Sequence, residues 1–500
     1  MDRLTTVLKN FARSHPNRPA VIDDKTELTY KELFERVNQW SRFLTEKGVD
    51  SGHSVMIFMN NQVGYLEVFL ALETINAKII PVNVHYQQSE IEYLMELNQN
   101  AYMISENSFT SLVKESFQGR RNSLIFIEDV YETDLNKYSK CEVPKEEFTS
   151  PLLFFTSGTT GKPKGIVVSP EAFTLQIPAE YYRDTTEYNL IIRPLFFRSH
   201  LTLAISIIQE GKTLVLTTSK SQEYIWILTH KYNIHQIISG PSDLTSLVDW
   251  LEESNEEMPG SLEVVMTTGN PTSYLLKKRL MEQMPDTSFI DFYGTSEVGG
   301  ISSIDETEWL DKHGSVGIPS FFVDCRVVDE NGEEVPKGEI GEISICSRYT
   351  MDEYLNNPAL NKKTFYGNLV RTGDYGYLDD DGYLFLSGRK QDEINHGGFS
   401  FYSAEVEDFL IRYSGVKEVV VLGKKNDTFG QQPIAYVVID KRLNKHKVMK
   451  EIKRMCEEQL PSFKRPVFWH FLSEIPLTSA RKPDRFKLLS LTEKTSEVLF

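Results

Sequence analysis

Two kinds of apolar segment alternate along most of this chain, and this alternation constrains the fold more than any other feature. Short runs typical of strands occupy residues 54–60, 101–105, 212–218, 235–242 and 262–271, and longer segments typical of helices occupy residues 64–77 and 221–233. Alternating strands and helices favour parallel sheets that helices cover on their faces. The sequence therefore predicts an α/β fold.

The pattern changes near residue 324. Residues 324–348 contain two strand-like runs around a turn at Asn331-Gly332, which is typical of antiparallel pairing. Further on, residues 416–440 resemble two strands, and a helix over 447–460 ends before Pro461. We expect a large N-terminal domain, residues 1–389, of mostly parallel sheets with helices plus a small antiparallel β subdomain. A small α+β C-terminal domain, residues 390–500, follows the polar segment near Gly388.

Charge and cysteine content limit the classes of partner. The formal net charge is -17, with 71 acidic and 54 basic residues, which argues against a nucleic-acid partner. The few cysteines lie far apart, so they suit a reducing compartment and show no zinc-site spacing. They are Cys141, Cys325, Cys346 and Cys456.

The sequence shows no targeting or membrane segment. The first twenty residues lack an apolar core typical of a secretory signal. The most apolar helical stretch, residues 65–82, contains Glu67, Glu73 and Lys78, which argues against a membrane span. We expect a cytoplasmic protein.

A loop rich in glycine and hydroxyl side chains, TSGTTGKPKG at residues 156–165, directly follows the apolar run 151–155. Its glycines allow backbone N–H groups to converge on an anion, and its lysines add positive charge. A plain surface loop is the alternative. The spacing excludes a Walker loop, because only two residues separate Gly158 from the Gly161-Lys162 pair. The density of donors favours a phosphate site.

Four further segments follow in a fixed order, and together with this loop they resemble the adenylate-forming (ANL) superfamily. The segments are TTGNP at 267–271, DFYGTSEVGG at 291–300, RTGDYGYLDDDGYLFLSGRKQDE at 371–393 and IPLTSARKPDRFK at 475–487. The superfamily contains acyl-CoA synthetases, luciferases and the adenylation domains of peptide synthetases. The resemblance covers essentially the whole chain, and it implies ATP and Mg²⁺ as cofactors.

The resemblance assigns a nucleotide site. It implies that Tyr293 stacks on adenine, that Ser296 contacts the α-phosphate and that Glu297 holds Mg²⁺. Asp374 would bind both ribose hydroxyls, and Arg389 the ribose and phosphate. The full implied cofactor-binding set is Thr156, Ser157, Gly158, Thr159, Thr160, Lys164, Gly269, Asn270, Asp291, Phe292, Tyr293, Gly294, Ser296, Asp374 and Arg389.

The C-terminal segments imply catalysis in two arrangements. Lys482 matches the essential lysine of the family pattern and, with Glu297, is the candidate catalytic residue. Gln391 takes the hinge position about which the small domain would rotate. Gly397 and Gly398 would then let the backbone approach the pantetheine arm of coenzyme A. The paired glycines favour CoA as the acceptor.

A second set of residues would form the acyl pocket: Phe196, Phe197, His200, Gly240, Thr268 and Gly299. An aromatic lining suits an aryl or medium-chain acid, and residues 195–200 contain no aspartate that could bind an α-ammonium group. This argues against amino-acid activation. His200 would either contact the substrate or lie hydrogen-bonded in the interior.

The chain departs from the family pattern at several positions. Gln391 stands where Asp or Lys is usual, and Asn395 where many relatives have lysine. Arg481 and Pro483 flank Lys482 where glycine and an aliphatic residue are usual. The expected function is therefore an ATP-dependent acid–CoA ligase acting on a small carboxylic acid. Two alternatives stay open: an adenylating enzyme that loads a carrier-protein thiol, and a nucleotide-binding regulator without catalysis.

Overall fold

The computed structural model describes most of the chain. The described residues are 4–117, 123–133, 135–144, 149–156, 163–174, 187–269, 272–309, 311–413, 415–426, 428–440, 442–478 and 482–494. No described helix combines the length and the apolar character that crossing a bilayer requires.

Seven strands form a first sheet in the order β18-β8-β7-β4-β3-β5-β6. Its parallel strands are β3 (Ser54–Phe58), β4 (Lys78–Pro81), β5 (Tyr102–Ser105), β6 (Leu124–Phe126) and β7 (Leu152–Thr156), and its antiparallel ones are β8 (Lys164–Val168) and β18 (Glu353–Tyr354). Thr156 and Lys164 face each other across β7 and β8, so they hold the two ends of the glycine-rich loop together.

The apolar stretch at residues 65–82 is a helix followed by a strand, not one helix. Buried helix α3 (Val63–Thr74) ends before Asn76, whose left-handed φ of 55° turns the chain into β4. A second helix, α4 (Gln88–Leu97), then precedes β5. Periodicity missed this division because every residue of α3 is buried, so no polar face marks the helix.

Nine strands form a second sheet in the order β15-β14-β13-β12-β11-β9-β10-β1-β2. They are β1 (Pro19–Ile22), β2 (Glu27–Thr29), β9 (Tyr188–Ile191), β10 (Thr213–Leu216), β11 (Gln236–Ser239), β12 (Val264–Thr268), β13 (Ser288–Thr295), β14 (Gly299–Asp305) and β15 (Ile318–Pro319). The strands from β1 to β13 along this order pair in parallel, and the pairs with β2, β14 and β15 are antiparallel.

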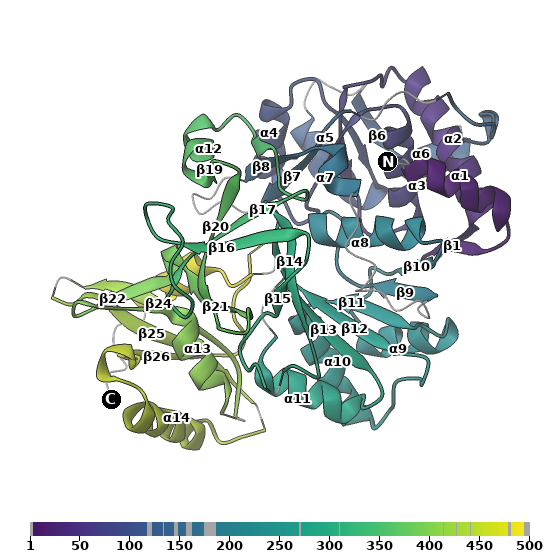
Figure 1. Ribbon diagram of the computed structural model, residues 1–500. Coiled ribbons are helices and arrows are strands. Elements are labelled where there is room, and N and C mark those ends of the chain that lie inside the picture. The colour runs from purple at the N-terminus through teal and green to yellow at the C-terminus, as the bar shows by residue number, and fades with distance from the viewer. Residues whose placement is uncertain are drawn as a thin grey trace.

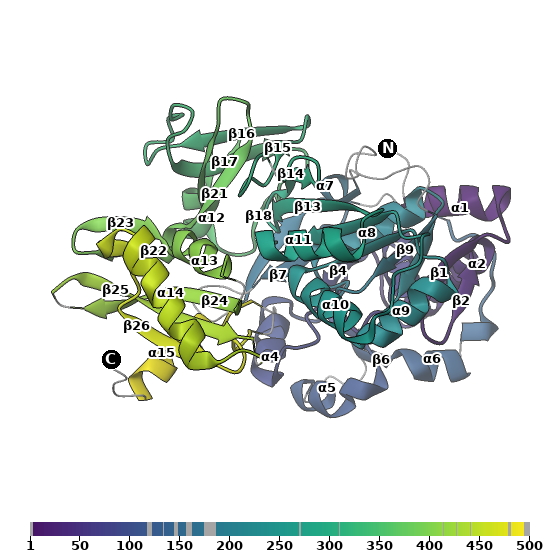
Figure 2. The ribbon, with the colours of Figure 1, turned by 90° about the horizontal axis from the view of Figure 1, so that it is seen from below.

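Both faces of this second sheet are covered. Successive residues of its inner strands alternate between two cores, so that Ile191 and Met266 face one core while Leu190 and Val265 face the other. The first core also contains α3, α8 (Arg198–Gln209) and strands of the first sheet. The second core contains α9 (Gln222–Lys231), α10 (Pro241–Ser254) and α11 (Tyr274–Gln283), which cover the sheet in Figure 2. This layered arrangement confirms the α/β prediction.

A third, antiparallel sheet contains β16 (Val323–Val328), β17 (Gly341–Ser347), β19 (Phe365–Tyr366), β20 (Leu369–Leu378) and β21 (Leu384–Arg389). The sequence predicted antiparallel pairing of the first two strands, and the structure confirms it. Asp374 on β20 and Arg389 on β21 are cross-strand partners, which fixes two candidate site residues side by side.

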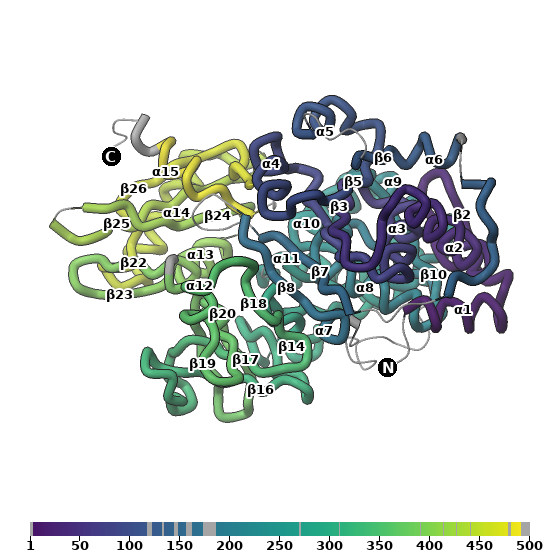
Figure 3. The backbone as a smooth tube through the Cα atoms, turned by 90° about the horizontal axis from the view of Figure 1, so that it is seen from above, coloured from purple at the N-terminus to yellow at the C-terminus, as the bar shows by residue number. Residues whose placement is uncertain are grey.

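The last part of the chain forms a smaller unit, here called the C-terminal unit. It contains β22 (Glu393–His396), β23 (Phe399–Tyr402), α13 (Ser403–Ile411), β24 (Val416–Asn426), β25 (Gly430–Ile439), α14 (Lys445–Gln459), β26 (Phe468–Leu472) and α15 (Arg485–Lys494). This unit lies at one end of the molecule, and α1 (Leu4–Ser14) and α2 (Tyr30–Glu46) lie at the other (Figures 1 and 3). Its α+β composition agrees with the prediction, while the division at residue 389 and the hinge at Gln391 stay predictions.

Candidate active site

Parallel strands of the second sheet end at one common edge, and several candidate residues follow those ends. Gly240 follows β11, Gly269 follows β12 and Ser296 follows β13, while Arg193 lies two residues beyond β9. The carboxyl ends of parallel strands are the usual place for ligands in open α/β sheets. The fold thus gathers residues that are far apart in sequence.

Asp374 is the centre of one hydrogen-bonded group. Its Oδ1 accepts from Nε of Arg389 at 2.8 Å, and its Oδ2 accepts from the hydroxyl of Tyr293 at 2.8 Å. Asp374 is buried, and its carboxylate raises the pKa of Arg389. Burial, followed by Asp374, raises the pKa of Tyr293. A carboxylate offers about four lone-pair sites, so these two bonds leave room for further donors such as hydroxyls.

Glu297 is held between two parts of the chain. Its Oε1 accepts from the hydroxyl of Tyr354 at 2.9 Å, and its backbone carbonyl accepts from the amide of Met351 at 2.6 Å. The ammonium of Lys164 lies 6.0 Å from the ring centroid of Tyr354. Tyr354 therefore connects the start of β8 with the candidate magnesium ligand, a contact that the sequence did not indicate.

Arg198 fixes the segment that carries Ser296 and Glu297. Its Nη1 donates to the carbonyl of Ser296 at 2.6 Å, and its Nη2 donates to the carbonyl of Tyr349. Burial lowers the pKa of Arg198 to about 10, against the opposing effect of Glu297. Sequence reasoning missed this role. The signal was a charged residue inside the apolar run at 195–208, because a buried charge needs partners.

Replacing Arg198 by methionine is expected to weaken both the fold and the site. Two backbone carbonyls would lose a charged donor that is itself buried, which lowers the free energy of unfolding by about 2–4 kcal/mol. Denaturant unfolding measures this loss, and the Mg²⁺ concentration for half-maximal activity should rise because Glu297 is less well held. An unchanged unfolding midpoint together with an unchanged Mg²⁺ requirement would contradict the positioning role.

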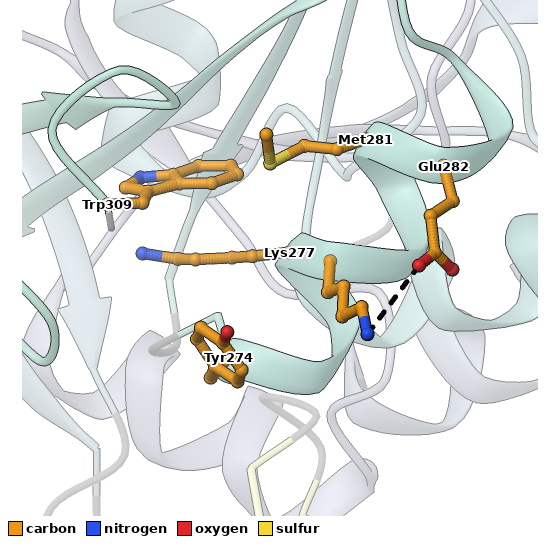
Figure 4. A pocket seen from close by; sticks show the side chains of 6 residues that line it. Tyr274, Lys277, Met281, Glu282 and Trp309 are labelled. Atoms are coloured by element: carbon orange, nitrogen blue, oxygen red, sulfur yellow. Dashed lines mark ion pairs between the residues drawn. The ribbon is translucent and has the colours of Figure 1, made fainter.

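Asp291 on β13 is held by side chains of β12, of α11 and of the segment between them. Its Oδ2 lies 2.8 Å from Nζ of Lys277, and its Oδ1 accepts from the hydroxyls of Thr272, at 2.6 Å, and Thr267. Lys277 extends between Trp309 and Tyr274 in a small pocket, 4.4 Å from the Trp309 ring centroid (Figure 4). Asp291 therefore braces the segment around Gly269, whose φ of +100° favours glycine. Its implied contact with the nucleotide stays a prediction.

The neighbouring positions of this motif form a close hairpin. A Cβ on Gly294 would lie 2.4 Å from the carbonyl of Gly299, so β13 and β14 approach too closely there for a side chain. Gly299 has a left-handed φ of +77° and lies against Tyr349. Phe292 pairs with Thr268 across β12 and β13, and its ring packs against the first core.

Lys482 reaches this group from the C-terminal unit. Burial among protein groups lowers the pKa of its ammonium, Arg389 lowers it further, and Asp374 and Glu297 oppose the shift. Solvent still reaches the side chain, which is exposed as a whole. The backbone carbonyl of Lys482 accepts from the amide of Thr478 at 2.7 Å, which ties the start of the segment leading into α15 to Thr478. The charges of Asp374, Glu297 and Arg389 therefore all act on Lys482.

Three of the six predicted acyl-pocket residues, Phe196, Phe197 and His200, form an aromatic group at the start of α8. The rings of Phe196 and Phe197 lie 4.4 Å apart, and the ring of His200 meets Phe197 edge-on at 5.7 Å. His200 is only 3% exposed, and burial with Arg193 lowers its pKa to about 3, so the imidazole is neutral. Its Nε2 has no hydrogen-bond partner among the described residues. This favours the substrate-contact interpretation of His200 over a satisfied interior histidine.

Two further sets complete the predicted residues. Ser157, Gly158, Thr159, Thr160 and Asn270 lie outside the described residues. Gly397 and Gly398 form the exposed turn between β22 and β23, with φ of +63° and +84°. These strands lie at the outer end of the C-terminal unit, away from β13 and β14 (Figures 1 and 2).

The residues present fit a magnesium ion held jointly with phosphate. Within the described part of the chain, His, Cys, Asp and Glu side chains form no group of three that could hold a metal by themselves. Mg²⁺ usually binds one or two carboxylates and completes its shell with water and substrate phosphates. The single carboxylate of Glu297 therefore fits the donor set of this kind of site, and its role as magnesium ligand stays a prediction.

Comparisons with known proteins identify the family of this chain. The family model of AMP-binding enzymes matches residues 8–355, and the model of their C-terminal domain matches residues 405–482. The chain is 28% identical to a 2-succinylbenzoate--CoA ligase of Bacillus licheniformis over 96% of this chain and 98% of that protein. It is 27% identical to a putative acyl--CoA ligase of Bacillus subtilis over 91% and 92% of the two chains.

Solved structures of CoA ligases share the fold of this chain. An o-succinylbenzoate CoA synthetase (MenE) from Bacillus subtilis, in complex with its acyl-adenylate intermediate, superposes with a TM-score of 0.85 and 26% identity over 98% of each chain. The anthranilate CoA ligase AuaEII superposes with a TM-score of 0.89 over 99% of this chain and 98% of that one, and its 22% identity supports the fold alone. The chain belongs to the AMP-binding enzyme family.

Proposed function

We propose that this protein joins a carboxylic acid to AMP with ATP and Mg²⁺, and then transfers the acyl group to coenzyme A. One observation carries the proposal: the Lys482 ammonium of the C-terminal unit lies in the same electrostatic group as Asp374, Glu297 and Arg389. A cation, a ribose-binding carboxylate and a magnesium-binding carboxylate at one place are the parts that adenylation needs.

The first step joins two anions. A carboxylate oxygen attacks the α-phosphorus, the bond from that phosphorus to the β-phosphate oxygen breaks, and pyrophosphate leaves. Preorganised cations stabilise the charge that accumulates during this attack without reorganising. Lys482 and Arg389 would supply such charge from two separate segments of the chain. Mg²⁺ held by Glu297 would neutralise phosphate oxygens. No general base is required, because the acid reacts as its carboxylate.

The second step needs a different arrangement. A thiol must attack the acyl carbon, so that AMP leaves and the thiol proton passes to solvent. The site that holds Lys482 cannot admit the pantetheine arm at the same time. We propose that the C-terminal unit turns about Gln391 and brings the Gly397-Gly398 turn to the site. These glycines have no side chain that would obstruct a narrow acceptor.

The acid is proposed to be an aryl acid. Phe196, Phe197 and the neutral His200 form an aromatic wall beside the edge where the nucleotide residues gather. Relatives named as 2-succinylbenzoate--CoA ligases, aligned over nearly the whole chain, support the same class. We take 2-succinylbenzoate as the first acid to test.

The experiment is an assay in two stages. The protein is incubated with ATP, Mg²⁺ and a panel of aryl and medium-chain acids, and pyrophosphate release is followed. CoA is then added to each responsive acid, and the product is weighed by mass spectrometry. Pyrophosphate release followed by an acyl-CoA is the expected result. Release without any CoA product would favour a carrier-protein acceptor, and no release with any acid would favour a regulator without catalysis.

The lowered pKa of Lys482 predicts the pH dependence of the first step. The ammonium is the active form, so adenylation should decline as pH rises through the lowered pKa, earlier than for an ordinary lysine with a pKa near 10.5. Replacement by arginine keeps the charge at high pH. The alkaline decline in pyrophosphate release should therefore disappear in Lys482→Arg, whatever its maximal rate. A decline at the same pH in both proteins would assign the titration to another group.

Three expectations from composition and motif order stay predictions. They are the cytoplasmic location, the absence of a nucleic-acid partner and the role of Gln391 as hinge.

A further inference from the structure

Arg193 lies where the acid is expected to bind, although no motif assigned it a role. The segment around it is fixed by Asn61, whose Nδ2 donates to the Arg193 carbonyl at 2.9 Å and whose Oδ1 accepts from the Leu195 amide at 2.9 Å. Arg193 itself is 6% exposed. The two hydrogen bonds from Asn61 fix the backbone at Arg193, and burial restricts the conformation of its side chain.

The guanidinium lies against two glycines. A Cβ on Gly240 would be 2.5 Å from Nη2 and 2.6 Å from Cζ of Arg193, and a Cβ on Gly269 would be 3.6 Å from Nη2. Only a residue without a side chain at position 240 leaves this space to the guanidinium. Gly240 follows β11 and Gly269 follows β12, so Arg193 lies across the same edge of the sheet as the nucleotide residues.

Arg193 acts electrostatically on two of the candidate site residues. Its positive charge contributes to lowering the pKa of both His200 and Lys482. Asp243 in the first turn of α10 partly balances it, with Nη1 and Oδ2 3.6 Å apart. A guanidinium carries five N–H donors, so it can hold more than one partner at a time.

His200 supplies a second, independent observation. Its imidazole is neutral and buried, and its Nε2 has no hydrogen-bond partner among the described residues. Buried polar atoms in folded proteins are nearly always hydrogen-bonded, so such an atom indicates a ligand. A neutral imidazole does not compete with Arg193 for an anion, but it can add one hydrogen bond to it.

We propose that Arg193, assisted by His200, binds a second anionic group on the acid and selects diacids over mono-acids. The inference rests on the proposed adenylating function and adds the substrate class to it. One carboxylate of the acid meets Lys482 and reacts, while the other pairs with the guanidinium. Arginine suits this role because its planar fork matches a carboxylate.

The test compares 2-succinylbenzoate with two mono-acids, 2-butanoylbenzoate and 4-oxo-4-phenylbutanoate. Each mono-acid lacks one of the two carboxylates, so the comparison holds whichever of them reacts. Pyrophosphate release with the full-length protein gives kcat/KM for each acid. Removing one partner of a buried charge pair is costly, and we expect the diacid to exceed the better mono-acid by about a hundredfold.

The variants are Arg193→Met, Arg193→Lys and, as a matched control, Arg198→Met. In Arg193→Met the ratio of kcat/KM for the diacid to that for the better mono-acid should fall to about threefold or less, mainly because KM for the diacid rises. Arg193→Lys should keep part of the preference for the diacid. Arg198→Met removes an equally buried arginine of the same segment that bonds to backbone carbonyls, so it should lower all rates and keep the ratio.

Several results would overturn the inference. Equal kcat/KM for the diacid and the mono-acids in the unmodified protein would already overturn the inference. An Arg193→Met ratio equal to that of the unmodified protein, or a gain with mono-acids alone, would mean that Arg193 only limits pocket size. No pyrophosphate with any acid would overturn the proposed function and this inference together, whereas activity without preference overturns only the inference.

Discussion

Lys482→Ala is expected to reduce pyrophosphate release by about a hundredfold to a thousandfold, the range for removal of one preorganised hydrogen-bond donor from a reaction site. The ammonium lies with Asp374, Glu297 and Arg389, where the α-phosphate would gather negative charge during attack. Its loss leaves the carboxylate and the phosphate to repel each other. Pyrophosphate release with ATP, Mg²⁺ and acid, without CoA, measures this step alone.

The same variant should keep most of its activity in the second step. Thioester formation from a supplied acyl-adenylate and CoA does not need Lys482, because the two-arrangement scheme places it elsewhere at that stage. Lys487→Ala is the matched control, since Lys487 is an exposed lysine on the neighbouring helix α15. Equal losses in the two steps, or a loss in the control as large as in Lys482→Ala, would refute the division of roles.

Glu297→Gln is expected to lower adenylation by about a hundredfold at ordinary Mg²⁺ concentrations, with partial recovery when Mg²⁺ is raised. An amide oxygen keeps the shape of the side chain and can still accept from Tyr354, but it lacks the charge that holds a hard cation. The fold should be little affected, because the contacts of the Glu297 backbone with Met351 and of the Ser296 backbone with Arg198 remain. Pyrophosphate release measured against Mg²⁺ concentration gives the shift.

Glu353→Gln serves as the control for this variant. Glu353 is an exposed carboxylate on β18, next to Tyr354, so its replacement removes the same charge a short distance from the site. It should leave the Mg²⁺ dependence as it is. If Glu297→Gln needed no more Mg²⁺ than the control, the ion would have to be held by another group.

Motif order predicted a set of candidate nucleotide-binding residues, but not the residues that hold this set in place. Asp374, Arg389 and Tyr293 belong to segments whose spacing matches a family, and the structure places them in one hydrogen-bonded group. Arg198, Tyr354 and Lys277 belong to no such segment. Their partners are backbone carbonyls and carboxylates that become neighbours only when the sheets assemble, so no local pattern reveals them.

The fold shows the same limit. Alternation predicted parallel sheets because exposed and buried faces leave a period in the sequence. The alternation did not separate α3 from β4, because α3 is completely buried and the two elements form one continuous apolar segment in the sequence. The left-handed Asn76 lies between them. The pairing of Asp374 with Arg389 depends on the register of β20 and β21, which the turn between the strands sets and composition does not.

The central claim is that the oxygen of a carboxylate becomes bonded to the α-phosphorus of ATP. The direct measurement uses an acid whose carboxylate carries a heavy-oxygen label, turned over with ATP, Mg²⁺ and CoA, followed by mass spectrometry of all phosphorus-containing products. The account predicts one labelled oxygen in AMP and none in pyrophosphate. Label in inorganic phosphate or pyrophosphate, or unlabelled AMP alongside a formed thioester, would contradict it.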